Sequence, residues 1–152
     1  CSPITGMSAE YAEFDGSPMS RKLGWSNDRH DWFYSDSYRT VANIGLDYEW
    51  FGIDEGQCAA GDRLQEFLLE DARRNQFHTY EINGTVAQSD VLHPVAIIAT
   101  VAQGSLAANN PFMNEWIERF WNTPMRTGVR RYYDNCLYFF AFLALSGKYR
   151  IW

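Results

Sequence analysis

Apolar residues recur at helical spacing in five stretches of the chain, and this pattern predicts an all-α protein. Pro94 marks the start of one helix, because proline is favoured at the first helical position. Gly147 is placed to end the last helix, since glycine commonly follows a helix C-terminus. The expected helices cover residues 35–52, 58–74, 94–106, 111–121 and 132–146.

The expected helices differ in how their polar residues are distributed. The helices over 58–74 and 111–121 each have one apolar and one polar face, which is typical of outer, solvated helices. The helix over 132–146 is apolar almost all round, which is typical of a buried inner helix. Outer and inner helices that alternate along a chain indicate helical hairpins in a layered all-α fold or a helical toroid.

Two segments depart from helical spacing. Prolines and glycines punctuate residues 1–34, so we expect loops there, ending in an irregular aromatic loop. Asn83-Gly84 lies in the alternating stretch 79–86 and predicts a small β-hairpin. No linker or repeat interrupts the chain, so residues 1–152 are expected to form one compact unit or part of one.

Composition and charge narrow the classes of partner. Six Trp, nine Tyr and ten Phe are more aromatic residues than a small core needs, and rings with polar tips suit a site that stacks on sugars. The net charge is −6 and the basic residues are scattered, so nucleic acid is not an expected partner. The longest apolar run, 136–145, is too short to span a membrane.

The three cysteines, Cys1, Cys58 and Cys136, are widely spaced and lack a CxxC motif or a histidine-rich companion. They indicate neither a disulfide framework nor a zinc site, and we expect no metal and no cofactor. The chain begins with Cys1 rather than methionine and no signal-peptide pattern precedes it. We therefore expect either a processed N-terminus or further residues upstream, and no compartment is indicated.

Asp36 is the strongest candidate for a catalytic residue. It lies at the expected start of the first helix, where backbone N–H groups favour a charged carboxylate, and Arg39 follows three residues later on the same face. An ionised carboxylate is what a general base requires. From spacing alone, however, a helix cap with a helical ion pair is the more common explanation.

Other candidates depend on position alone. His93 precedes a proline-initiated helix, where a packed or capping side chain is the usual role. The rings of Trp25, Trp32, Phe33 and Tyr34 could stack on sugar or simply pack their loop. The stretch 130–134 lies just before the inner helix and could reach a cleft, although capping and hydrogen bonds between helices are the preferred reading.

Several long strings then match a known family in order: 34–52, 92–94, 120–128 and 130–138. They resemble the C-terminal part of glycoside hydrolase family 8, and within it the reducing-end xylose-releasing exo-oligoxylanases. The resemblance covers essentially the whole chain. It implies the C-terminal part of an (α/α)6 barrel, a six-hairpin toroid, with a small β-hairpin insertion, and a cleft for a β-1,4-linked chain.

The resemblance also implies hydrolysis with inversion, in which an acid protonates the leaving oxygen and a separate carboxylate activates water. Asp36 matches the base of the family. The family's acid is a glutamate before a Gly-Met-Ser string, and Gly6-Met7-Ser8 lacks that glutamate. We therefore expect the acid in a missing N-terminal part of the barrel, so that this chain alone is an incomplete enzyme.

By the same resemblance, Leu92-His93-Pro94 matches a loop that closes the cleft, with His93 on the reducing-end hydroxyl. The expected partner is a xylo-oligosaccharide. The residues expected to bind it are His93, Arg39, Tyr38, Trp25, Trp32 and Tyr34. The alternatives are an endo-acting relative on xylan, cellulose or chitosan, and a non-catalytic carbohydrate-binding remnant.

Overall fold

The structure is a computed structural model that describes residues 1–20, 29–52 and 54–151. Its α-helices are α1 (Tyr38–Phe51), α2 (Glu55–Phe67), α3 (Leu69–Arg74), α4 (Pro94–Gln103), α5 (Met113–Asn122) and α6 (Arg131–Leu145). Two short 3-10 helices are η1 (Ser35–Ser37) and η2 (Gly104–Leu106). The strands are β1 (Trp32–Phe33), β2 (Thr79–Glu81) and β3 (Val86–Gln88).

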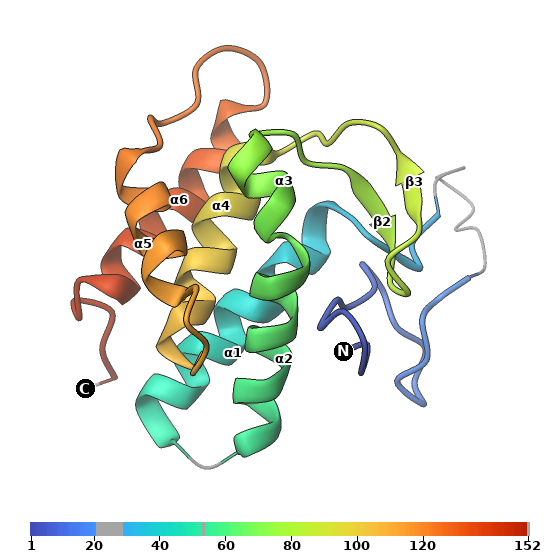
Figure 1. The fold of residues 1–152 in the computed structure, drawn as a ribbon, viewed down its shortest axis with the longest axis horizontal. Helices are drawn as coiled ribbons and strands as arrows, with labels where there is room; N and C mark the ends of the chain where they lie inside the picture. The colour runs from blue at the N-terminus through green and yellow to red at the C-terminus, as the bar shows by residue number, and fades with distance from the viewer. Residues whose placement is uncertain (21–28, 53, 152) are drawn as a thin grey trace.

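Helix α4 forms the centre of the molecule. It packs against α1, α5 and α6, and every residue from Ala96 to Gln103 is buried. In Figure 1, α1, α4 and α6 run in the same direction, whereas α2, α3 and α5 return on the outside. The alternation of inner and outer helices expected from the sequence is therefore present.

The expected helix over 58–74 is two helices. The first begins earlier, at Glu55, because the Asp54 side chain accepts a hydrogen bond from the backbone N–H of Gly56, 2.7 Å away. The two helices meet at Leu68, a turn residue whose backbone, at φ −84° and ψ 0°, stays in the right-handed helical region. The boundaries of α4, α5 and α6 lie within about two residues of the expected ones, apart from the tight turn η2 that ends the 94–106 stretch.

The hairpin predicted around Gly84 is present as β2 and β3, and Gly84 has a φ of 98° that glycine adopts without strain. A third strand, β1, pairs antiparallel with β2 through Trp32 and Glu81. This stretch was expected to be an irregular loop. The pairing joins positions far apart in the sequence, so no local pattern could indicate it.

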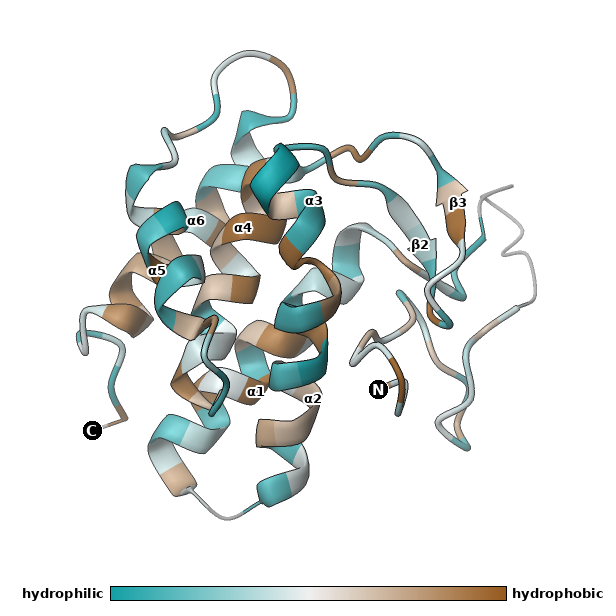
Figure 2. Cartoon of the chain, viewed as in Figure 1, coloured by the Kyte–Doolittle hydropathy of each residue, from teal (hydrophilic) through white to brown (hydrophobic). Residues whose placement is uncertain are grey.

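The core lies where the inner helices meet the outer ones, and Figure 2 shows apolar residues concentrated along α4. Its largest fully buried side chains include Trp116 from α5 and Phe120 one turn further on. Close approach of α1 to α4 depends on Gly45, where a Cβ atom would collide with the carbonyl oxygen of Gln103. Glycine thus sets the distance between two inner helices.

One face of α6 is not covered. Phe139, Phe140 and Phe142 are 56%, 43% and 40% exposed, so the expectation of a fully buried helix is wrong for this face. Leu137, on the opposite side, is buried. Trp121 of α5 stacks on Phe142 and is itself 67% exposed. In the described part of the chain, no helix is long and apolar enough to cross a membrane.

Candidate active site

The three inner helices α1, α4 and α6 begin at the same end of the molecule, and this end gathers the candidate residues (Figure 1). Asp36 lies in the turn before α1, His93 directly before α4, and Tyr133 in the first turn of α6. The His93 and Tyr133 rings lie 4.5 Å apart between centroids. The Tyr133 hydroxyl donates to the carbonyl oxygen of Ser35, 2.8 Å away. Residues from three separate hairpins therefore meet.

Asp36 is held in a tight turn with its carboxylate at the surface. The turn is closed by Ser37, whose hydroxyl accepts from the Tyr34 N–H at 2.8 Å. Ser35 has a φ of 37°, in the left-handed region that non-glycine residues seldom adopt. Arg39 Nη2 lies 3.0 Å from Asp36 Oδ2, and the Asp36 side chain is 32% exposed. The ion pair expected from the spacing is present, on a carboxylate that solvent can reach.

Glu10 and His30 form a buried pair that contacts this turn. Glu10 Oε2 lies 2.6 Å from His30 Nδ1, and the two side chains are 7% and 5% exposed. Glu10 Oε1 accepts a long hydrogen bond of 3.5 Å from the Asp36 N–H. The His30 ring stacks on Tyr11 at 4.7 Å between centroids. Glu10 was not expected at this site, because a single glutamate in a loop-rich segment carries no pattern.

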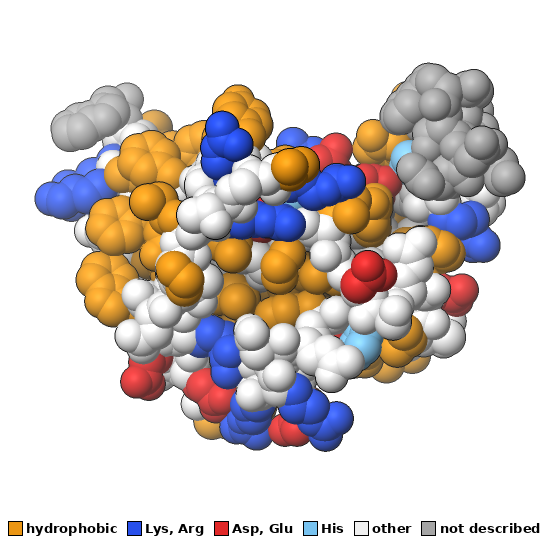
Figure 3. Space-filling model, turned by 90° about the horizontal axis from the view of Figure 1, so that it is seen from above, with side chains coloured by type: hydrophobic (Ala, Val, Ile, Leu, Met, Phe, Trp, Pro, Cys, Tyr) orange, Lys and Arg blue, Asp and Glu red, His pale blue; other side chains and the backbone are white. Residues whose placement is uncertain are grey.

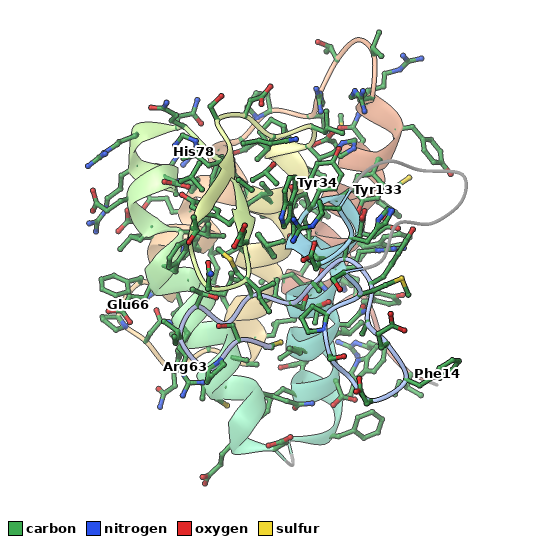
Figure 4. The ribbon with its side chains drawn as sticks, turned by 90° about the vertical axis from the view of Figure 1, so that its right-hand side faces the viewer. Phe14, Tyr34, Arg63, Glu66, His78 and Tyr133 are labelled. Atoms are coloured by element: carbon green, nitrogen blue, oxygen red, sulfur yellow. The ribbon has the colours of Figure 1, made fainter. Side chains whose placement is uncertain are left out.

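Tyr133 connects the Asp36 turn to His93. Burial is the main cause that raises the pKa of its hydroxyl above the ordinary value, and the negative charge of Asp36 raises it further. The hydroxyl therefore keeps its proton and can donate to Ser35. The preferred reading of 130–134, hydrogen bonds between helices, is confirmed for Tyr133. Figure 4 shows Tyr133 and Tyr34 at the same end of the molecule.

His93 is held through its ring rather than acting as a helix cap. Its side chain makes no capping hydrogen bond to α4, so the capping alternative is wrong. Instead Nδ1 lies 2.8 Å from Oδ2 of Asp134, a fully buried carboxylate on α6. Asp134 Oδ1 accepts from the Ala96 N–H at 2.9 Å, and Arg126 Nη1 lies 2.6 Å from Oδ2. Asp134 therefore caps α4 from a neighbouring helix.

The aromatic residues expected to bind sugar differ in how exposed their side chains are. Trp32 and Tyr34 are partly exposed, and the Arg29 guanidinium lies 5.5 Å from the centre of the Trp32 ring. Tyr38 is only 1% exposed and packs edge-on against Phe33, so its ring has no surface to offer a sugar, contrary to our expectation. Trp25 lies outside the described residues.

A groove of about 600 Å³ opens beside the start of α4, at the end that Figure 3 views from above. Its apolar walls come from Pro94, Val95 and Ile98 of α4 and from Pro124. Its polar rim comes mostly from α5. The residues expected to act on a substrate lie outside this groove. Among the described residues, no cluster of three or more His, Cys, Asp or Glu is arranged to hold a metal ion.

Comparisons with known proteins place the whole chain beside one group of enzymes. It is 49% identical over 152 residues to the reducing-end xylose-releasing exo-oligoxylanase Rex8A of Paenibacillus barcinonensis, with 100% of this chain and 39% of that protein aligned. It is 51% identical over 157 residues to a reducing end xylose-releasing exo-oligoxylanase of Bifidobacterium adolescentis, with 99% and 39% aligned. No family model matches the chain.

A solved structure agrees with the sequence comparison. The structure of Rex8A complexed with xylose superposes with a TM-score of 0.92 at 47% identity, and the match covers 99% of this chain and 39% of that one. The chain is thus similar to the C-terminal portion of these enzymes and spans about two fifths of their length. The expected fold is confirmed as the C-terminal part of an (α/α)6 barrel.

Proposed function

We propose that this chain is the base-bearing C-terminal part of an inverting glycoside hydrolase that releases xylose from the reducing end of β-1,4-linked xylo-oligosaccharides. The observation that carries the proposal is sequence identity: over the full chain, about half of the residues are identical to those of reducing-end xylose-releasing exo-oligoxylanases. It is supported by the surface carboxylate of Asp36, paired with Arg39 at the common end of the inner helices.

Asp36 acts as the general base. Its carboxylate takes a proton from a water molecule as the water oxygen forms a bond to the anomeric carbon. The bond from that carbon to the leaving oxygen breaks on the opposite face, and the leaving oxygen receives a proton from an acid outside this chain. Arg39 holds the carboxylate in place while it remains about one third exposed, so water can reach it.

His93 recognises the end of the substrate. It lies at the start of α4, where its ring contacts the ring of Tyr133. The Tyr133 hydroxyl in turn donates to Ser35 in the Asp36 turn. A hydrogen bond between its ring and the hydroxyl of the terminal sugar favours substrates with a single sugar residue beyond the cleaved bond. Tyr34, Trp32 and Arg39 are the exposed or partly exposed residues that contact the remaining sugar rings.

The test uses the full-length protein with xylotriose and xylohexaose as substrates. Asp36→Asn should reduce kcat by about 10²- to 10⁴-fold, the usual contribution of a general base, while xylotriose still binds. Asp54→Asn is the matched control, because Asp54 caps α2 away from the site and asparagine caps equally well. Proton NMR of the first product formed reports whether the anomeric configuration inverts.

The outcomes separate the alternatives. Xylose released stepwise from the reducing end supports the proposal, and a mixture of internal fragments would indicate an endo-acting enzyme. Sugar binding without turnover would indicate a non-catalytic remnant. Full activity of Asp36→Asn would exclude this residue as the base. For His93→Ala we expect weaker xylotriose binding and a less regular product pattern, and unchanged products would remove His93 from end recognition.

A further inference from the structure

We infer that Asp134 is the positioning residue for His93, fixing which ring nitrogen faces the substrate so that Nε2 accepts a hydrogen bond from a sugar hydroxyl. This inference rests on the proposed role of His93. Asp134 touches no substrate itself, because its side chain is fully buried on α6. It acts through three hydrogen bonds, two to the segment that carries His93 and one to Arg126, which itself donates to Leu92 in that segment.

The three bonds fix both the ring and the backbone around it. Asp134 Oδ2 lies 2.8 Å from His93 Nδ1, and Oδ1 lies 2.9 Å from the N–H of Ala96 in the first turn of α4. Arg126 Nη1 lies 2.6 Å from Oδ2 and also donates to the carbonyl oxygen of Leu92. The backbone on both sides of His93 and its ring are thus tied to a single carboxylate.

The carboxylate dictates the tautomer of a neutral His93 ring. An ionised aspartate has lone pairs but no proton to give, so the nitrogen that faces it must carry the hydrogen. Nδ1 therefore donates to Asp134, and Nε2 is left with a free lone pair. Arg126 provides the balancing positive charge for the buried carboxylate. The orientation that follows makes His93 an acceptor toward the substrate.

Neighbouring contacts remove the remaining freedom of the ring. The Tyr133 ring lies 4.5 Å from the His93 ring between centroids and is tilted 46° to it. The loop that carries Arg126 is itself clamped to α6, since Asn135 accepts from the Arg126 N–H at 2.9 Å and donates to its carbonyl oxygen at 3.0 Å. His93 therefore sits on a rigid support built largely from α6.

The test is Asp134→Asn in the full-length protein, with histidine labelled by ¹⁵N. An asparagine has only one acceptor oxygen for three donors, so the variant should favour the tautomer with hydrogen on Nε2. Long-range ¹H–¹⁵N NMR reports the tautomer, and the His93 signal is assigned by its loss in His93→Ala. We expect KM for xylotriose to rise by about tenfold, with a smaller change in kcat. The matched control is Asp71→Asn. Asp71 lies on the outer helix α3, where its carboxylate accepts a hydrogen bond from the Tyr80 hydroxyl.

The wild-type spectrum decides the inference even if the variant does not fold. Hydrogen on Nδ1 alone supports it, whereas hydrogen on Nε2 in the wild type, with or without hydrogen on Nδ1, would overturn it. An unchanged KM and tautomer in Asp134→Asn would also overturn it. The proposed function would fail separately, if His93→Ala left the product pattern and xylotriose binding unaltered.

Discussion

Tyr133 donates its hydroxyl hydrogen to the carbonyl oxygen of Ser35, 98 residues earlier in the chain. This bond ties the first turn of α6 to the strained turn that presents Asp36. A strained turn persists only when its surroundings hold it, and Tyr133 is one of the groups that do so. Asp36, the proposed base, and His93, the proposed end-recognition residue, thus share one support, because Tyr133 also packs on His93.

Tyr133→Phe should therefore cost both stability and activity. Removing the hydroxyl leaves the Ser35 carbonyl without this donor, and the free energy of unfolding should fall by about 1 kcal/mol. Urea unfolding of the full-length protein measures the loss, and kcat should fall as Asp36 loses its alignment. Tyr132→Phe is the control, since Tyr132 is 83% exposed. Equal stability of the two variants would show that the bond contributes nothing.

Tyr38→Phe should behave in the opposite way. The Tyr38 hydroxyl is buried and has no hydrogen-bond partner among the described residues, so its removal should leave stability at neutral pH unchanged or raised. Burial is the main cause that raises the pKa of Tyr38 above the ordinary value of 10.0. Because the unfolded chain then releases its proton at lower pH than the folded one, the wild type loses stability relative to Tyr38→Phe as the pH rises above 10.0.

The measurement for Tyr38 is the free energy of unfolding as a function of pH from 7 to 11. The wild type should lose stability above about pH 10 more steeply than Tyr38→Phe. Parallel curves for the two proteins would contradict burial of an unpartnered hydroxyl.

Gly45→Ala should destabilise the packing of α1 on α4. The new Cβ atom meets the backbone carbonyl of Gln103, which cannot move without shifting α4, and overpacking of this kind costs about 1–3 kcal/mol. Gly61→Ala in α2 is the matched control, because its Cβ would lie 3.7 Å from the carbonyl oxygen of Gly104. There the better helix propensity of alanine should dominate and add up to about 1 kcal/mol. A stable Gly45→Ala protein would show that α1 and α4 can separate.

The uncovered face of α6 should make the 152-residue chain associate when it is produced by itself. Three exposed phenylalanines and Trp121 form a contiguous apolar surface of the kind that drives self-association. Sedimentation velocity at several concentrations should reveal dimers or larger species. The double variant Phe139→Ser/Phe142→Ser should shift them toward monomer. A wild-type monomer with a sharp cooperative melt would contradict the prediction.

The sequence patterns predicted those features of the fold that interactions between neighbouring residues determine. Pro94 identified the start of α4 and Asn83-Gly84 identified the hairpin, because a proline ring and a tight turn act within a few residues. Strand β1 was missed, because its partner Glu81 is remote in sequence. Asp134 was noticed only as a residue near a helix start, since a sequence does not show that its carboxylate is buried beside His93.

The error at Tyr38 has a geometric cause. Tyr38 is close to Asp36 in sequence, and this closeness suggested a shared site. A helix turns by about 100° per residue, so two positions onward the side chain points to the other side and enters the core. Residues that are neighbours in sequence at the start of a helix can therefore face different surroundings. Whether a side chain faces the core depends on its position around the helix axis.

The common starting point of α1, α4 and α6 has an electrostatic consequence for the acids gathered there. Each helix carries a macrodipole equivalent to about half a positive charge at its N-terminus. The Asp36 carboxylate lies in the turn that leads into α1, and Asp134 accepts directly from the first turn of α4. Hairpins stacked with their inner helices in parallel therefore create a region where anionic side chains are stabilised, which offsets part of the cost of burying Asp134. In a protein of net charge −6, this end of the barrel segment therefore tolerates negative charge through its helix N-termini as well as through its arginines.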